Sequence, residues 1–240
     1  MRIIALAITF TVLLAGCVTS VALPPTRVEQ IKTLAVVVMP YDNVRVSHRG
    51  FTVFNNEGTS YDANEWGVAA MKMAALRHVL EPRFTLVEIP APAVDQDEAL
   101  DSSLDWRLKT IVAPAYAAAG VKADAILYVD TRREVAFYDS EWKFAGCGLY
   151  DVHVPLRDIY LTRVYCVGAL HVVDPATMTT MASSYYATPD YLSALVEPVE
   201  DFDWSGTKLS DAQIAKAKRA IGALLDQYMP ALVRNTGLVP

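Results

Sequence analysis

The spacing of apolar residues along the first half of the chain predicts alternating strands and helices. Ile31–Met39 is a compact, β-branched run, the pattern of a strand buried on both faces. Phe84–Ile89 and Ala125–Asp130 predict two further strands. A helix is expected to open at Asp62, and a second one is expected over Asp105–Ala119. The first helix has one apolar stripe, formed by Trp66, Ala69, Met73, Leu76 and Leu80.

The second half of the chain has the pattern of antiparallel strands. Ile159–Val173 is a long aromatic and β-branched run, and residues 179–186 can return beside it after an Asp-Pro turn. Residues 132–165 are more than a minimal domain needs and are expected to form an extended β-hairpin insertion. Ser210 and Gln213 stand in capping-box spacing and open a closing helix.

These elements predict an α/β (α+β) fold with the order βαβαβββα. The expected architecture is a mixed β-sheet with about three helices packed on it. The chain has no internal repeat, so a single domain is expected over residues 31–235. Residues 187–208 show no period and are expected to be irregular.

The first twenty residues have the pattern of an export signal. Arg2 precedes an apolar run, Ile3–Leu14, which is too short to span a membrane but suits a signal peptide. Leu14-Ala15-Gly16-Cys17 then matches a lipobox. We expect residues 1–16 to be removed and Cys17 to carry lipid, which would bind the protein to a membrane. An ordinary signal peptide with a chance cysteine and an uncleaved anchor are the alternatives.

The residues that follow Cys17 indicate which membrane the lipid would bind. Val18 is not the aspartate that often retains lipoproteins at the inner membrane, so the outer membrane is favoured, with the body facing the periplasm. Residues 17–30 contain Pro24-Pro25 and little periodicity, and they are expected to form a lipidated tether. No later stretch reaches 18 apolar residues, which indicates a body with its own core.

The charge of the chain bears on the class of partner, and its cysteines bear on a possible disulfide. The chain has 27 acidic against 21 basic residues and a net charge of −6, which disfavours nucleic acid as a partner. Cys147 and Cys166 are the two cysteines left in the mature body. In an oxidising periplasm such a pair is expected to form a disulfide, although two buried free thiols are the alternative.

The chain shows no motif that indicates catalysis. None of its four histidines has metal-ligand spacing, and GxSxG, P-loop and GxGxxG motifs are absent. We therefore expect a non-enzymatic protein without a cofactor or metal. The candidate surface for a partner or ligand is a set of aromatic residues interleaved with acids: Tyr185, Tyr186, Tyr191, Phe202 and Trp204. The alternative is a long loop that these aromatics pin over the core.

Three segments resemble a group of periplasmic domains. ALRHVLEPRFTLVEI (75–89), ADAILYVD (123–130) and LHVVDPATMTTMASS (170–184) are similar to motifs of the curli-secretion lipoprotein, the TolB N-terminal domain and the penicillin-binding-protein activator lipoproteins. One departure is Met178, which stands where these families have a turn glycine. The resemblance implies the same mixed fold and action through binding and assembly.

The leading hypothesis from the sequence is a membrane-anchored lipoprotein that binds a protein partner in cell-envelope assembly, maintenance or export. One alternative is a subunit of a curli-type outer-membrane secretion pore. Another is a glycan or small-ligand binding lipoprotein that uses the aromatic residues. The partner's identity does not follow from the sequence.

Overall fold

The computed structural model describes most of the chain after the expected signal peptide. The residues described are 20–39, 41, 43–49, 57–136, 139–154, 159–186, 194–199, 202 and 208–240. Cys17, Tyr191 and Trp204 lie outside these residues, as does the expected signal peptide over residues 1–16. None of the helices in the described ranges is long and apolar enough to cross a membrane.

A mixed sheet forms the centre of the molecule and confirms the predicted fold class. Its strand order is β3-β2-β8-β9-β5-β1-β4, and β10 and β11 also pair with β9. β1 pairs in parallel with β4 and β5, whereas β9 pairs antiparallel with β5 and β8. The strands are β1 (Thr33–Val38), β2 (Asn43–Arg49), β3 (Glu57–Asp62), β4 (Thr85–Ile89), β5 (Ala125–Thr131), β8 (Cys147–Val154), β9 (Ile159–Val173), β10 (Thr180–Tyr185) and β11 (Ala194–Pro198).

The register divides this sheet into two halves that share β9. β5 pairs with β9 as far as Gly168, and β8 takes up the pairing at Cys166. The preceding strands follow the same division. β1 pairs with β5, and the next strand in the chain, β2, pairs with β8. We call β4, β1, β5 and β10 with their part of β9 the near half, and β3, β2, β8 and β11 with the rest of β9 the far half. Several strands are thus interrupted along one line across the sheet.

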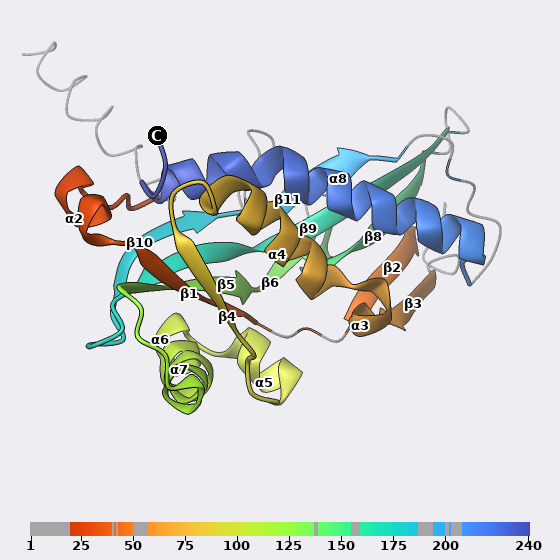
Figure 1. Ribbon diagram of the computed structural model, residues 1–240. Coiled ribbons are helices and arrows are strands. Elements are labelled where there is room, and N and C mark those ends of the chain that lie inside the picture. The colour runs from red at the N-terminus through yellow and green to blue at the C-terminus, as the bar shows by residue number, and fades with distance from the viewer. Residues whose placement is uncertain are drawn as a thin grey trace, which may run out of the picture.

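Helices cover the near half on both faces. In Figure 1, α4 (Val68–Leu80) and α8 (Asp211–Asn235) lie across one face, and α5 (Gln96–Asp101), α6 (Leu104–Arg107) and α7 (Ala113–Ala119) lie below the other. Alternate residues of β1 enter the two cores, Leu34 and Val36 on the α4 side, Ala35 and Val37 on the α7 side. This double burial explains the continuous apolar run in the sequence.

The N-terminal segment corrects the expected tether over residues 17–30. Backbone hydrogen bonds join Val21 to Ser183, and the Leu23 N–H donates to the Thr236 carbonyl at 2.8 Å. α2 (Pro25–Gln30) follows, and Leu23 and Val28 are buried in the core on the α8 side. Proline suits the first position of a helix, so Pro24-Pro25 begins α2 instead of marking an extended linker. The domain therefore starts near residue 21.

The expected insertion over residues 132–165 is also built differently from the prediction. β6 (Arg133–Ala136) and β7 (Asp139–Ala145) form a small two-stranded sheet of their own. β8 does pair with β9 as a hairpin, but it also pairs with β2, so it belongs to the central sheet. β11 is a further strand in the segment that was expected to be irregular. The sequence indicated strands here but could not show which strand lies beside which.

Cys147 and Cys166 form the expected disulfide. They occupy directly paired positions of β8 and β9, and their sulfur atoms are 2.05 Å apart. Both side chains are buried on the α8 side of the sheet. The bond therefore joins the first residue of β8 to the strand shared by the two halves.

Reduction of this disulfide is expected to lower the free energy of unfolding by about 2–4 kcal/mol, because the bond closes a loop in the unfolded chain. The cysteines are 19 residues apart. Denaturant unfolding of the wild-type protein, oxidised against fully reduced, measures the effect without an amino-acid substitution. A decrease below about 1 kcal/mol would show that the bond does not constrain the unfolded chain as its loop length implies.

Candidate functional site

The predicted aromatic surface does not form as expected. Tyr186 is fully buried in the core on the α8 side, and Phe202 is 7% exposed. Tyr185 is half-buried, with its ring 5.4 Å from the guanidinium of Arg132. Tyr186 and Phe202 are therefore packing residues, a correction that fits the alternative of aromatics pinned over the core. The structure gives no position for Tyr191 and Trp204.

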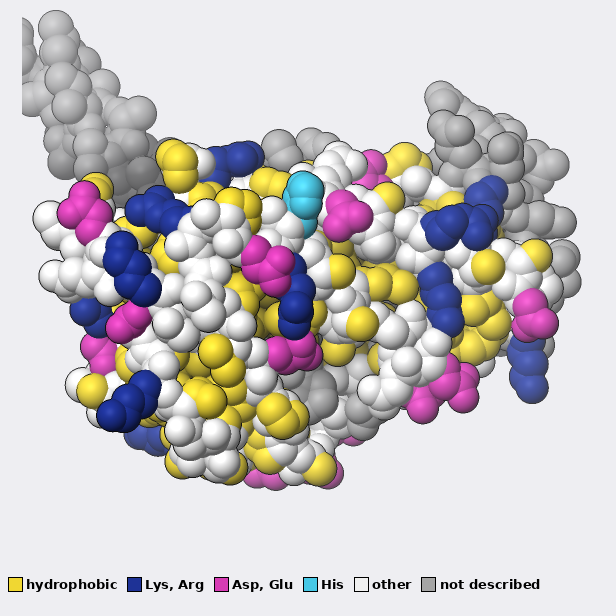
Figure 2. Space-filling model, viewed as in Figure 1, with side chains coloured by type: hydrophobic (Ala, Val, Ile, Leu, Met, Phe, Trp, Pro, Cys, Tyr) yellow, Lys and Arg dark blue, Asp and Glu magenta, His cyan; other side chains and the backbone are white. Residues whose placement is uncertain are grey.

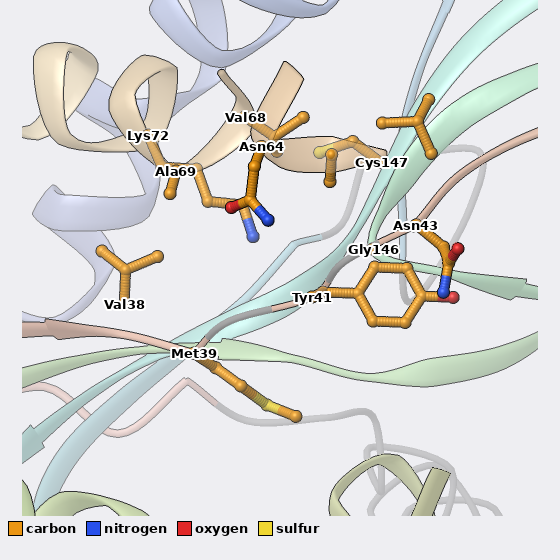
Figure 3. A pocket seen from close by; sticks show the side chains of 12 residues that line it. Val38, Met39, Tyr41, Asn43, Asn64, Val68, Ala69, Lys72, Gly146 and Cys147 are labelled. Carbon is orange, nitrogen blue, oxygen red and sulfur yellow. The ribbon is translucent and has the colours of Figure 1, made fainter. Parts of the chain in front are cut away.

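A cavity lies where the sheet is interrupted, between the end of β1 and the start of α4. Its volume is about 80 Å³. Figure 3 shows it between Met39 and Tyr41 on one side and Lys72 and Asn64 on the other. Cys147 of the disulfide also contributes to its wall. In α/β sheets, ligands bind outside the carboxyl ends of parallel strands where successive connections leave in opposite directions, and β1, between β4 and β5, ends at such a point.

Lys72 is the one cation among the described residues that line this cavity. It extends from α4, is only 3% exposed, and its ammonium donates to the Thr131 hydroxyl at 3.2 Å. The Tyr186 ring centroid lies 6.0 Å from Nζ. Burial lowers the pKa of Lys72 to about 8, and the nearby carboxylate of Asp130 opposes part of that shift. Within the described residues, no carboxylate lies within salt-bridge distance of this ammonium.

The sequence analysis did not single out Lys72, which lies beside the predicted apolar stripe of the first helix. Asp62 caps a short helix, α3 (Ala63–Trp66), as expected, but Gly67 then adopts a left-handed conformation with φ 71°. The buried face of α4 keeps Met73, Leu76 and Leu80 of the predicted stripe and also includes Lys72, whereas Ala69 is exposed. Lys72 stands four residues before the buried Leu76, so the two residues share one face of the helix. This spacing is the feature of the sequence that could have identified Lys72 as buried.

A buried ion pair lies on the other face of the sheet from Lys72. Asp130 of β5 is completely buried and accepts a hydrogen bond from Arg107 Nη2 at 3.1 Å. Arg107 Nε lies 3.0 Å from the second carboxylate oxygen, an electrostatic contact without hydrogen-bond geometry. Nη1 donates to the carbonyls of Ala99 and Ser102 at 3.0 and 2.6 Å. His171 Nε2 approaches the same carboxylate at 3.5 Å. Arg107 therefore offsets the charge of Asp130.

Gly146 and Gly168 lie at the interruption of the sheet, where a Cβ atom would clash with neighbouring residues. A Cβ on Gly146, whose φ is +59°, would lie 2.3 Å from the ring of Tyr41. A Cβ on Gly168 would lie 2.3 Å from the Asp130 carbonyl oxygen and 3.4 Å from the Tyr186 ring. Larger residues at either position would displace a wall of the cavity or the end of β5.

A second polar row crosses the far half of the sheet. His48 Nδ1 lies 2.6 Å from Asp151, and the Thr162 hydroxyl donates to the other oxygen of that carboxylate at 2.5 Å. The three residues are cross-strand neighbours on β2, β8 and β9. The hydroxyl contacts the carboxylate and not the imidazole, so the row lacks the nucleophile-to-base order of a hydrolase triad. In the part of the chain that the structure describes, no three metal-binding side chains cluster as a site.

The visible surface has no strongly basic region. Figure 2 shows basic and acidic side chains interspersed across this face, with apolar side chains between them. A nucleic-acid interface needs clustered basic residues that neutralise several phosphates. This face therefore does not have the electrostatic pattern of such an interface.

Comparison with known proteins leaves the family open. No protein-family model matches the chain, and no curated protein matches it. Among solved structures, it is similar to a Xanthomonas campestris protein described as DUF330, with 13% identity, 90% of each chain covered and a TM-score of 0.39. It is also similar to the PelC dodecamer from Paraburkholderia phytofirmans, with 12% identity, 86% of this chain and 92% of that chain covered, and a TM-score of 0.31. Scores this low do not establish a shared fold, so the families that the sequence motifs resemble stay a prediction.

The depressed pKa of Lys72 makes the stability of the protein depend on pH. Between pH 8 and pH 10.5 the folded lysine has lost its proton while the unfolded lysine still binds one, so stability rises with pH in that window. Lys72→Met removes this contribution. The unfolding free energy of the wild type relative to Lys72→Met is expected to rise by roughly 2–3 kcal/mol from pH 7 to pH 10.

Denaturant unfolding of both proteins at each pH measures this difference, in which all other titrating groups cancel. Lys109→Met is the matched control, because that lysine is 70% exposed. A difference that stays constant with pH would show that the Lys72 ammonium is fully stabilised in the fold.

Proposed function

We propose that this protein is a non-enzymatic lipoprotein of the bacterial cell envelope, anchored through Cys17, whose domain binds a protein partner in envelope assembly, maintenance or export. The lipobox supports the anchor, and the bonded cysteines suit an oxidising compartment. The outer membrane, with the domain facing the periplasm, is the proposed location.

The carrying observation is how little chain separates the expected lipid from the folded domain. Val21 is already paired with Ser183, so only residues 18–20 are left as a linker. Four peptide steps of an extended chain span about 14 Å. A lipid on Cys17 would therefore place the α2 end of the domain directly at the membrane surface. Val21, with 53% of its surface exposed, lies at this end.

The opposite end of the molecule is then the part presented to a partner. Figure 1 shows α2 and the C-terminus at one end and β2, β3 and α3 at the other. Among the described strands, β3 pairs only with β2, so its other edge has backbone groups that an added strand could bind. Strand addition to an exposed edge is a common mode of protein recognition. We propose the edge of β3 as the contact for the partner.

Site-specific photo-crosslinking in intact cells tests both parts of the proposal. A photoreactive residue at the exposed Ser60 of β3 is expected to give one dominant adduct of stoichiometric yield. The same residue at the exposed Glu98 of α5 is the matched control and is expected to give none. When an ordinary cleavable signal peptide replaces residues 1–17, the protein is expected in the soluble periplasmic fraction, and the Ser60 adduct is expected to weaken because the domain no longer lies at the membrane.

Two results would contradict the proposal. Equal adduct patterns from Ser60 and Glu98 would remove the β3 edge as the partner contact. A wild-type protein that carries no lipid by mass spectrometry and fractionates with soluble proteins would remove the anchor. A Ser60 adduct with a second copy of the same chain, together with a ring-shaped oligomer in detergent, would favour the secretion-pore alternative instead.

A further inference from the structure

The cavity at the sheet interruption combines a buried cation with walls that carry no acid. Its described lining contains one ammonium, that of Lys72, and no carboxylate. Polar groups that can donate hydrogen bonds come from Tyr41, Asn43 and Asn64, and apolar walls come from Val38, Val44 and Val68. A buried cation without a counter-ion is costly, and a bound anion would offset that cost.

The start of α4 adds to the same electrostatic preference. Val68 and Ala69, the first residues of this 13-residue helix, also line the cavity. The residue before them, Gly67, has no side chain to cap the helix. The N-terminal end of a helix carries a partial positive charge and favours anions. The helix end and the Lys72 ammonium are two separate sources of positive potential at one cavity.

The charged groups around Lys72 do not cancel this potential. Asp130 of β5 is the nearest acid that acts on Lys72, and it is already held by Arg107 on the opposite face of the sheet. Tyr186, which packs beside the ammonium, has its pKa raised by burial and stays neutral. Burial also raises the pKa of Tyr41, which Arg133 and Arg45 partly oppose. Arg107 thus already offsets the charge of Asp130, and no acid among the described residues pairs with Lys72.

We propose that this cavity is a binding site for a small monocarboxylate, whose carboxylate pairs with the Lys72 ammonium and whose short apolar part contacts the valine walls. A volume of about 80 Å³ suits an anion of only a few heavy atoms. A single ammonium offsets one charge, which favours a carboxylate over a doubly charged phosphate. The site is independent of the lipid anchor and of the β3 edge.

Propionate is the probe, and the Lys72 side chain reports its binding. Lysine labelled with ¹³C at Cε gives an NMR signal for Lys72 that is absent from Lys72→Met. In the free protein, the signal is expected to titrate with a pKa of about 8. Saturating propionate is expected to raise that pKa by at least about one unit, and its affinity is expected to fall up to about tenfold for each pH unit above 8. Phosphate at the same ionic strength is expected to bind more weakly.

Lys72→Met is expected to lose propionate binding, whereas Lys109→Met keeps it, because that lysine is exposed at the surface. The wild-type titration needs no variant, so a folding defect in Lys72→Met would not hide the answer. A Lys72 pKa that does not move with propionate would overturn the proposal. So would a free-protein pKa at the ordinary value for lysine, or equal propionate affinity in Lys72→Met. None of these results affects the anchor or the partner contact.

Discussion

The ion pair between Arg107 and Asp130 is the interaction on which the middle of this structure depends. Asp130 is the penultimate residue of β5 and has no exposed surface. An isolated buried carboxylate would cost several kcal/mol, so its position requires the guanidinium. Arg107 in turn binds the carbonyls of Ala99 and Ser102. One side chain, on the last residue of α6, therefore joins the end of α6 to the end of β5 and the end of α5.

The ion pair lies beside the interruption of the sheet and the cavity. β5 stops at Thr131, the small β6–β7 sheet leaves the central sheet, and β8 resumes the pairing with β9. Asp130 is paired with Arg107 on one face of the sheet. On the other face, the Lys72 ammonium donates to the Thr131 hydroxyl and lies 6.0 Å from the centroid of the Tyr186 ring. The end of β5 thus has a paired carboxylate on one face of the sheet and, on the other face, a lysine that lines the cavity.

The sequence predicted the parts of this fold that depend on local pattern. β1, β4, β5 and β9 were located because short apolar and β-branched runs are recognisable without their neighbours. β1 and β5 are buried on both faces, whereas β4 lies at the edge of the sheet with Thr85 and Glu88 exposed. The capping box of Ser210 and Gln213 is present at the start of α8, as its spacing predicted. Local chemistry was sufficient in these cases.

The parts that were missed depend on contacts between distant segments. The docking of Leu23 beside Thr236 could not be seen from a proline-containing stretch near the N-terminus. Lys72 was not singled out, because the spacing does not show that the buried face of α4 extends beyond the predicted apolar stripe. Tyr186 looked like a surface aromatic, yet the space over Gly168 accepts its ring. Each error arose where tertiary packing decided the environment of a side chain.

A double-mutant cycle on Arg107 and Asp130 tests the central claim most directly. Arg107→Met and Asp130→Asn are each expected to reduce the free energy of unfolding by about 3–5 kcal/mol, because each leaves its partner buried and uncompensated. The double variant is expected to lose far less than the sum, with a coupling energy of about 2–3 kcal/mol. Losses that add to within about 0.5 kcal/mol would show that the two residues act independently. The ion pair would then not be what holds the end of β5 in place.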